Sequence, residues 1–181
     1  MMGRKSADGE KGPDNLMEAL SDEAADPVIL RPAVLRDVEA IVELVNFYAS
    51  RGEMLPKSLS QVYQNIRDFV VAEREGRIVG CGALHILWDN LAEIRSLAVV
   101  EAERQRGIGG RIVRALLDDA RRLAVPRVFA LTYKPQFFVR CGFVPIERES
   151  LPRKIWGDCI DCVKFPRCDE VALICDLEVQ S

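Results

Sequence analysis

The stretch from residue 91 to residue 132 restricts the possible folds more than any other part of the sequence. Residues 107–123 carry apolar side chains at helical spacing, which predicts a helix with one buried face: Ile108, Ile112, Leu116, Ala120 and Leu123. Apolar runs at 91–100 and 127–132 predict a strand on either side of this helix. A strand, a helix and a second strand at this spacing form a crossover, which places the two strands parallel in one sheet. The sequence therefore predicts an α/β fold.

The rest of the sequence predicts further strands and helices around this crossover. Short apolar runs predict strands at 28–31, 69–72, 78–87 and 171–177. Glu75 and Gly76 separate the second and third of these runs, which is typical of a hairpin. We expect one helix after Asp37, which can cap it, and a shorter one after Ser58, which forms a capping-box pattern with Gln61.

Residues 1–27 differ in character from the rest of the chain. They are polar, acidic on balance and free of aromatic side chains, so we expect a disordered N-terminal tail followed by one domain over residues 28–181. The first residues also lack the apolar core of a signal peptide, and no apolar run approaches the roughly 20 residues that span a bilayer. We therefore expect a cytoplasmic protein with no membrane partner.

The formal net charge of -3 argues against a surface built to bind nucleic acid. Six cysteines are present, and a cytoplasmic location favours reduced thiols. Cys159 and Cys162 have the spacing of a metal knuckle, with Cys168 and Cys175 further along. Two interpretations stay open: a structural zinc or iron–sulfur site, and reduced cysteines that pack as small hydrophobic side chains. The second is favoured, so no metal is predicted.

The segment 104–110, Arg-Gln-Arg-Gly-Ile-Gly-Gly, lies between a predicted strand and a predicted helix. Glycines let the backbone turn tightly and approach a ligand, and the N–H groups of the first helical turn then face that ligand. With the helix dipole behind them, these groups suit a pyrophosphate, and Arg104 and Arg106 add positive charge. A flexible loop would explain the glycines alone. The segment lacks the Lys-Ser/Thr end of a Walker loop and the first glycine of a dinucleotide fingerprint.

Leu97-Ala98-Val99, followed by Arg104-x-x-Gly107-x-Gly109, resembles motif A of the GNAT acetyltransferases. Residues 137–143, which end in Gly-Phe, are similar to the late helix of that family. The resemblance spans residues 28–178 and implies the GNAT fold, a mixed central sheet with a strand-loop-helix site for the pyrophosphate of acetyl-CoA. By this resemblance the backbone near Leu97, Ala98 and Val99 would hold the pantetheine arm. The pyrophosphate would bind to Arg104, Gln105, Arg106, Gly107, Ile108, Gly109 and Gly110.

Longer phrases resemble the catalytic domain of the N-acetylglutamate synthases, in the short form that has no amino-acid-kinase domain. They lie at 51–56, 79–85, 92–99, 129–132 and 159–170. The resemblance implies acetyl transfer to the α-amine of L-glutamate, the entry to arginine biosynthesis. Other small amines such as glutamine stay open as acceptors. A non-catalytic acyl-CoA-binding module and a metal-stabilised interaction domain stay open as functions, and a homodimer as the assembly.

Glutamate carries two carboxylates and one amine, so its site needs cations and a group that accepts a proton. The candidate cations are Lys57, His85, Arg95 and Lys154, of which Lys57 and His85 match basic positions of the synthases. Glu93 is the candidate general base, and it alternates with Arg95 on one face of a strand, so an ion pair between them is the alternative.

The late helix bears on how the thiolate of coenzyme A is protonated when it leaves. Many GNAT enzymes place a tyrosine there to protonate the departing thiolate, and the corresponding residue here is Phe138, which has no proton to donate. Tyr133 is the nearest tyrosine in the sequence. The Val99 N–H would polarise the thioester carbonyl.

Overall fold

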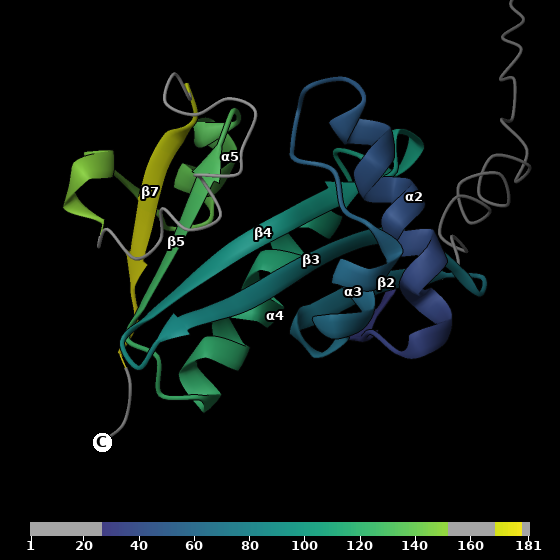
Figure 1. Cartoon of the computed structure of the whole chain (residues 1–181), viewed down its shortest axis with the longest axis horizontal. Helices are drawn as coiled ribbons and strands as arrows, with labels where there is room; N and C mark the ends of the chain where they lie inside the picture. Colours follow the sequence, from purple (N-terminus) through teal and green to yellow (C-terminus); the bar gives the residue numbers. More distant parts are fainter. Residues whose placement is uncertain (1–26, 152–168, 179–181) are drawn as a thin grey trace, which may run out of the picture.

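The computed structural model describes residues 27–151 and 169–178, and a single mixed sheet organises this part of the chain (Figure 1). Its strand order is β1-β2-β3-β4-β5-β7-β6. The strands are β1 (Ile29–Pro32), β2 (Phe69–Arg74), β3 (Arg77–Trp88), β4 (Leu91–Val99), β5 (Arg127–Thr132), β6 (Val144–Ile146) and β7 (Val171–Asp176). β4 and β5 are parallel, and the other neighbouring strands are antiparallel. The predicted crossover and the α/β fold are thus confirmed.

Helices cover both faces of this sheet. They are α2 (Val38–Ala49), α3 (Leu59–Gln64), α4 (Ile108–Arg122) and α5 (Pro135–Arg140), with short 3-10 turns η1 (Leu35–Asp37), η2 (Ile66–Asp68), η3 (Glu101–Glu103) and η4 (Arg148–Ser150). α4 packs on one face and α2 on the other (Figure 1). Within residues 27–151 and 169–178, no helix has the length and apolar character that a membrane crossing requires.

The apolar stripe of the central helix buries the side chains that its spacing indicates, with one exception. Ile112 and Leu116 of α4 are fully buried against the sheet. Leu123, the last residue of the predicted stripe, is 61% exposed because it is the C-cap of α4, where the helix has ended. Ile41 and Val45 of α2 form a second core on the opposite face.

One predicted cap is confirmed and the other is wrong. Ser58 Oγ accepts the Gln61 N–H at 3.2 Å, and Gln61 Oε1 accepts the Ser58 N–H at 2.8 Å. Asp37 does not cap α2, because η1 precedes the helix and turns the carboxylate back to the Val34 N–H at 2.8 Å. Asp37 also forms an ion pair with Arg31 at 2.6 Å.

The buried Asp37 carboxylate therefore acts as a structural tie. Arg31, which also reaches Glu73 at 2.5 Å, lowers the pKa of Asp37 through its hydrogen bond. A carboxylate with a lowered pKa contributes stability fully above its unfolded-state pKa of about 3.9. That contribution is lost as the pH falls through the pKa of the folded state.

The pairing of β4 with its neighbours is irregular, and this positions the site. β4 and β5 pair at Ala92–Val128 and Glu93–Phe129, and they diverge beyond these residues (Figure 1). Ser96 then takes a positive φ of 54°, and the register of β4 against β3 shifts there by one residue, which is a β-bulge.

The bulge at Ser96 changes which face each later side chain of β4 meets. Before it, Ala92 and Ile94 face the core beneath α4. After it, Leu97 and Val99 pack against that core, and Ala98 enters the core beneath α2. Side chains alternate along a strand, so Glu93 and Arg95 lie on the face opposite Ile94.

Gly82 of β3 allows α4 to approach the sheet closely. A Cβ atom at Gly82 would lie 2.8 Å from Ile112 Cγ2 and 3.1 Å from Leu97 Cδ1. Carbon atoms do not approach so closely without displacement of one of them.

We expect Gly82→Ala to lower the free energy of unfolding by about 1–3 kcal/mol, because the new methyl group overpacks the contact with α4. Denaturant unfolding measures this. Gly110→Ala is the matched control: its Cβ meets nothing within 4 Å, and it lies in a helix. It should be neutral or stabilise by up to about 1 kcal/mol. Equal effects of the two substitutions would contradict the close packing.

Candidate active site

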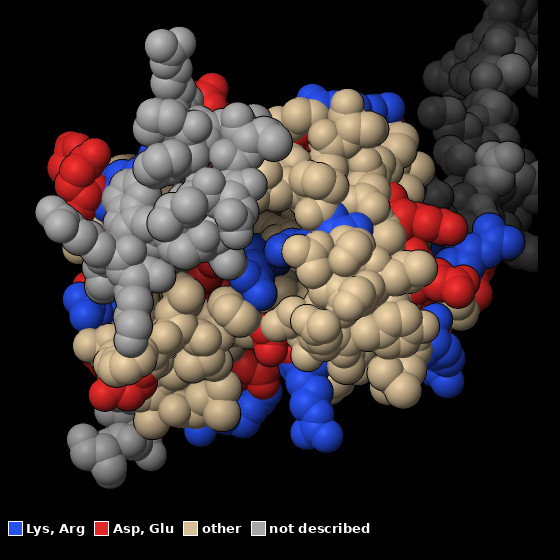
Figure 2. Space-filling view, viewed as in Figure 1, with Lys and Arg blue, Asp and Glu red and all other residues tan. Residues whose placement is uncertain are grey.

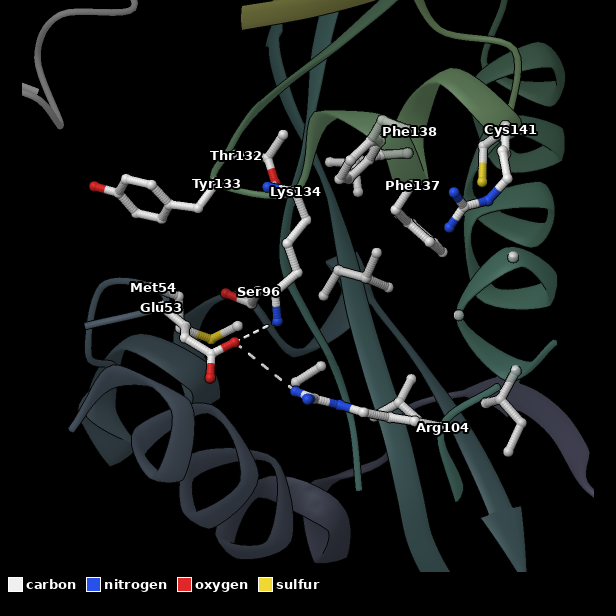
Figure 3. A pocket seen from close by; sticks show the side chains of 18 of the residues that line it. Glu53, Met54, Ser96, Arg104, Thr132, Tyr133, Lys134, Phe137, Phe138 and Cys141 are labelled. Atoms are coloured by element: carbon white, nitrogen blue, oxygen red, sulfur yellow. Dashed lines mark hydrogen bonds and ion pairs between the residues drawn. The ribbon is translucent and has the colours of Figure 1, made fainter. Parts of the chain in front are cut away.

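A cleft of about 980 Å³ opens where β4 and β5 part (Figure 3). One wall is β4 from Ile94 to Val99, and the other is the end of β5 with Thr132 and Lys134. The glycine-rich turn before α4 and the apolar side of α5 complete it. Backbone groups of a strand that has lost its neighbour need other partners, so this edge can bind a ligand that carries amide groups.

The turn into α4 has the geometry of an anion site. Gly107 has a φ of 76° and Gln105 a φ of 65°, so the chain turns sharply before the helix begins. No described side chain caps the first N–H groups of α4. A Cβ at Gly110 would meet no atom within 4 Å, which shows that space adjoins the first turn. The uncapped N–H groups and the helix dipole fit a pyrophosphate.

An acidic side chain links two cations at the mouth of the cleft. Glu53 forms an ion pair with Lys134 and lies 3.8 Å from Arg104 (Figure 3). The hydrogen bond from Lys134 is the main cause that lowers the pKa of Glu53, which keeps this carboxylate ionised. Figure 2 shows Lys and Arg side chains meeting at a hollow in the middle of this face of the molecule.

Tyr48 of α2 contacts both the end of β4 and Arg104 of the turn before α4. Its hydroxyl donates to the Val99 carbonyl at 2.6 Å, at the end of β4. The Arg104 guanidinium lies 4.6 Å from the centre of its ring, within the range of a cation–π contact. Burial raises the pKa of Tyr48, so the hydroxyl keeps its proton.

The structure brings most of the predicted cofactor residues together around this cleft. The lining residues among them are Leu97, Ala98, Val99, Arg104, Gln105, Gly107, Ile108, Gly109 and Gly110. Arg106 does not line the cleft, and its side chain lies 3.7 Å from Glu103. The role of each residue in binding stays a prediction.

Two of the predicted acceptor residues, Glu93 and Arg95, lie on the face of β4 opposite Ile94. Arg95 lines the cleft, whereas Lys57, His85 and Glu93 are not among its lining residues. Glu93 and His85 are cross-strand partners, so their side chains share one face of the sheet. His85 Nδ1 lies 2.9 Å from Asp68 Oδ2, a contact that the sequence did not indicate.

Lys57 is held through its backbone. Its N–H donates to Asn46 Oδ1 and its carbonyl accepts from Asn46 Nδ2, each at 2.9 Å, which fixes the loop after α2. Lys154 lies outside the described residues, as do Cys159, Cys162 and Cys168. Of the described thiols, Cys81 is buried, and this raises its pKa to about 12.

α5 is the late helix of the sequence analysis, and it carries Phe138 at the position where many GNAT enzymes have a tyrosine. Phe138 is buried and makes edge-to-face contacts with Phe137 and Phe143, with ring centres 5.2 Å apart in each pair. Tyr133 lines the cleft, but its ring points away from Arg104 in Figure 3.

Comparison with known proteins identifies the family. The model of the Acetyltransferase (GNAT) family matches residues 38–143. An amino-acid acetyltransferase of Mycobacterium tuberculosis is 43% identical over 133 residues, which are 72% of this chain and 76% of that protein. A solved structure of a Mycobacterium tuberculosis protein in complex with CoA and NLQ has a TM-score of 0.73 and 35% identity, over 83% of this chain and 99% of that one.

N-acetylglutamate synthase from Neisseria gonorrhoeae, solved with coenzyme A and N-acetyl-glutamate, has a TM-score of 0.76 and 26% identity. The similarity covers 84% of this chain and 35% of that longer one. The sheet order, the parted strands and the glycine-rich turn agree with the family match, which spans more than half of the sequence. The chain belongs to the GNAT family of acetyltransferases.

Proposed function

We propose that this acetyltransferase transfers the acetyl group of acetyl-CoA to the α-amine of L-glutamate, which is the entry to arginine biosynthesis. The observation that carries the proposal is the position of Arg95, a cation that lines the cleft on the strand where β4 leaves β5. Glu93 precedes it on the same face of that strand. The similarity to an amino-acid acetyltransferase and to an N-acetylglutamate synthase supports an amino acid as the acceptor.

The donor side of the site is built by the turn and the free edge of β4. Acetyl-CoA supplies an acetyl group activated as a thioester. The N–H groups at the start of α4, with Arg104 beside them, hold its pyrophosphate. The backbone of Leu97, Ala98 and Val99 holds the pantetheine arm, and the Val99 N–H polarises the thioester carbonyl.

The acceptor side is built by the other face of the sheet. Arg95 binds a carboxylate of glutamate, Lys57 adds positive charge from the neighbouring loop, and His85 contributes its imidazole ring from the neighbouring strand. Glu93 accepts the proton of the α-amine, directly or through a water molecule, so that the nitrogen lone pair can attack the carbonyl carbon. As the C–N bond forms the C–S bond breaks, and the nitrogen releases its second proton to water. Coenzyme A leaves as a thiolate that water protonates, since Phe138 has no proton to donate. The bulge at Ser96 separates these roles, since it directs Arg95 and Leu97 to opposite faces.

We expect Gly110→Glu to weaken acetyl-CoA binding by at least about tenfold, because a carboxylate in the first turn of α4 repels the pyrophosphate. Titration calorimetry with acetyl-CoA measures the dissociation constant. Gly110→Ala is the control, since it fills the same open space without charge. Gly109 suits this test less well, because its Cβ would lie 3.3 Å from the Phe137 ring. Unchanged affinity in a folded Gly110→Glu protein would contradict the assignment of the turn.

We expect Arg95→Ala to lower kcat/KM for glutamate by roughly ten- to hundredfold, the effect of losing one charge-assisted hydrogen bond. The KM for acetyl-CoA should change little. Lys57→Ala should act in the same direction. Arg77→Ala removes the same charge from an exposed end of β3 and should leave both constants unchanged. An acceptor screen provides the check: a preference for lysine or a polyamine over glutamate would reject the proposed acceptor but leave acetyl transfer intact.

We expect Glu93→Gln to lower the rate near neutral pH by about 10²- to 10⁴-fold, the usual loss when a general base is removed. Part of the rate should return at high pH, where the amine loses its proton unaided. Glu75→Gln, in the β2–β3 turn, makes the same change in charge away from the site. Initial rates across a pH series measure both variants. Near-normal turnover of Glu93→Gln would restrict Glu93 to a structural role beside Arg95.

A further inference from the structure

The cleft continues past the glycine-rich turn into the space between α4 and α5. Its lining residues there are Gly107, the N-cap of α4, then Ile108, Gly109 and Gly110 of the first turn, and then Arg114, one turn further along the helix from Gly110. On α5 the lining includes Arg140 and Cys141. A helix rises about 1.5 Å per residue, so Arg114 lies roughly 10 Å along the axis from Gly107.

Arg114 and Arg140 differ from Arg104 and Lys134, the two cations at the mouth of the cleft. Both side chains are exposed, and neither forms an ion pair with a carboxylate in residues 27–151 or 169–178. By contrast, Arg104 and Lys134 both face Glu53. Among the described residues, the two arginines therefore carry positive charge at the α4–α5 end of the cleft that no carboxylate pairs with.

The acidic residues that line the cleft, Glu53, Glu103 and Glu170, lie outside α4 and α5. Glu53 lies between two cations at the mouth, and Glu103 is 2.7 Å from Arg74. Glu170 precedes β7, whose first residue pairs with Thr132 at the end of β5. None of these three carboxylates belongs to α4 or α5, so in the part of the chain that the structure describes, no carboxylate of either helix lines the cleft.

The guanidinium groups of Arg114 and Arg140 both act electrostatically on Cys141. Burial raises the pKa of Cys141, and the positive charges of Arg114 and Arg140 oppose this rise. Both charges are thus near enough to Cys141 to act on it, although they come from different helices. Two arginines that converge from two helices form a site for a phosphate group, which accepts several charge-assisted hydrogen bonds at once.

We infer that Arg114 and Arg140 bind the 3′-phosphate of coenzyme A and so select acetyl-CoA over donors that lack this group. The inference rests on the proposed use of acetyl-CoA. Coenzyme A carries a pyrophosphate and, on its ribose, a separate phosphate monoester. With the pyrophosphate at the first turn of α4, the ribose extends along the α4–α5 groove toward the two arginines. The pantetheine arm extends the other way, toward β4.

Direct binding of coenzyme A and of 3′-dephospho-coenzyme A tests the inference without an acceptor or a reaction. We expect the protein to bind coenzyme A about ten- to hundredfold more tightly than the dephospho form at low salt. In Arg114→Ala/Arg140→Ala this ratio should fall to near one, because the affinity for coenzyme A falls while that for the dephospho form is unchanged. Rising ionic strength should reduce the ratio in the unmodified protein.

Arg121→Ala/Arg122→Ala is the matched control, since it removes two charges from the same helix at residues paired with Asp118 and Asp119, outside the cleft. It should keep the full ratio. A ratio near one in the unmodified protein would overturn the inference while leaving the proposed function in place. Equal loss in both double variants would overturn it as well, since net charge would then be the cause. Failure to bind either ligand would overturn the proposed function and this inference with it.

Discussion

The parting of β4 from β5 is the constraint on which the rest of the site depends. The two parallel strands pair at Ala92–Val128 and Glu93–Phe129 and then diverge. Beyond that point the edge of β4 has backbone donors and acceptors without a strand opposite, and an extended ligand with amide groups can pair with them as a strand would. The sheet is thus interrupted at its centre, where one face carries α4 and the other carries α2.

The bulge at Ser96 directs the side chains of β4 on either side of it to different faces of the sheet. Upstream of it, Arg95 points away from the core beneath α4, and downstream Leu97 packs on that core. One strand therefore presents a charge on the face of the proposed acceptor site and apolar side chains on the face beneath α4 within three residues. Gly82 makes this arrangement compact, because it lets Ile112 of α4 lie directly against β3.

The fold was predictable from the sequence because its determinants are local. Helical spacing at 107–123, the hairpin turn and the glycines at 107–110 each act within a few residues. The contacts of the cleft join distant residues, and no local pattern encodes them: Glu53 and Lys134 are 81 positions apart. Tyr48 is buried in α2, but the spacing of apolar residues could not indicate the hydrogen bond from its hydroxyl to the Val99 carbonyl. The predicted capping of α2 by Asp37 was wrong because the 3-10 turn η1 brings the Val34 N–H to its carboxylate instead.

The double contact of Tyr48 has a consequence for the thermodynamics of binding. Its hydroxyl fixes the end of β4 and its ring supports Arg104, so the two regions that would hold the pantetheine arm and the pyrophosphate are set relative to each other by one buried side chain. This order is established when the chain folds. The site is preorganised, and less conformational entropy of the protein is lost when the donor binds.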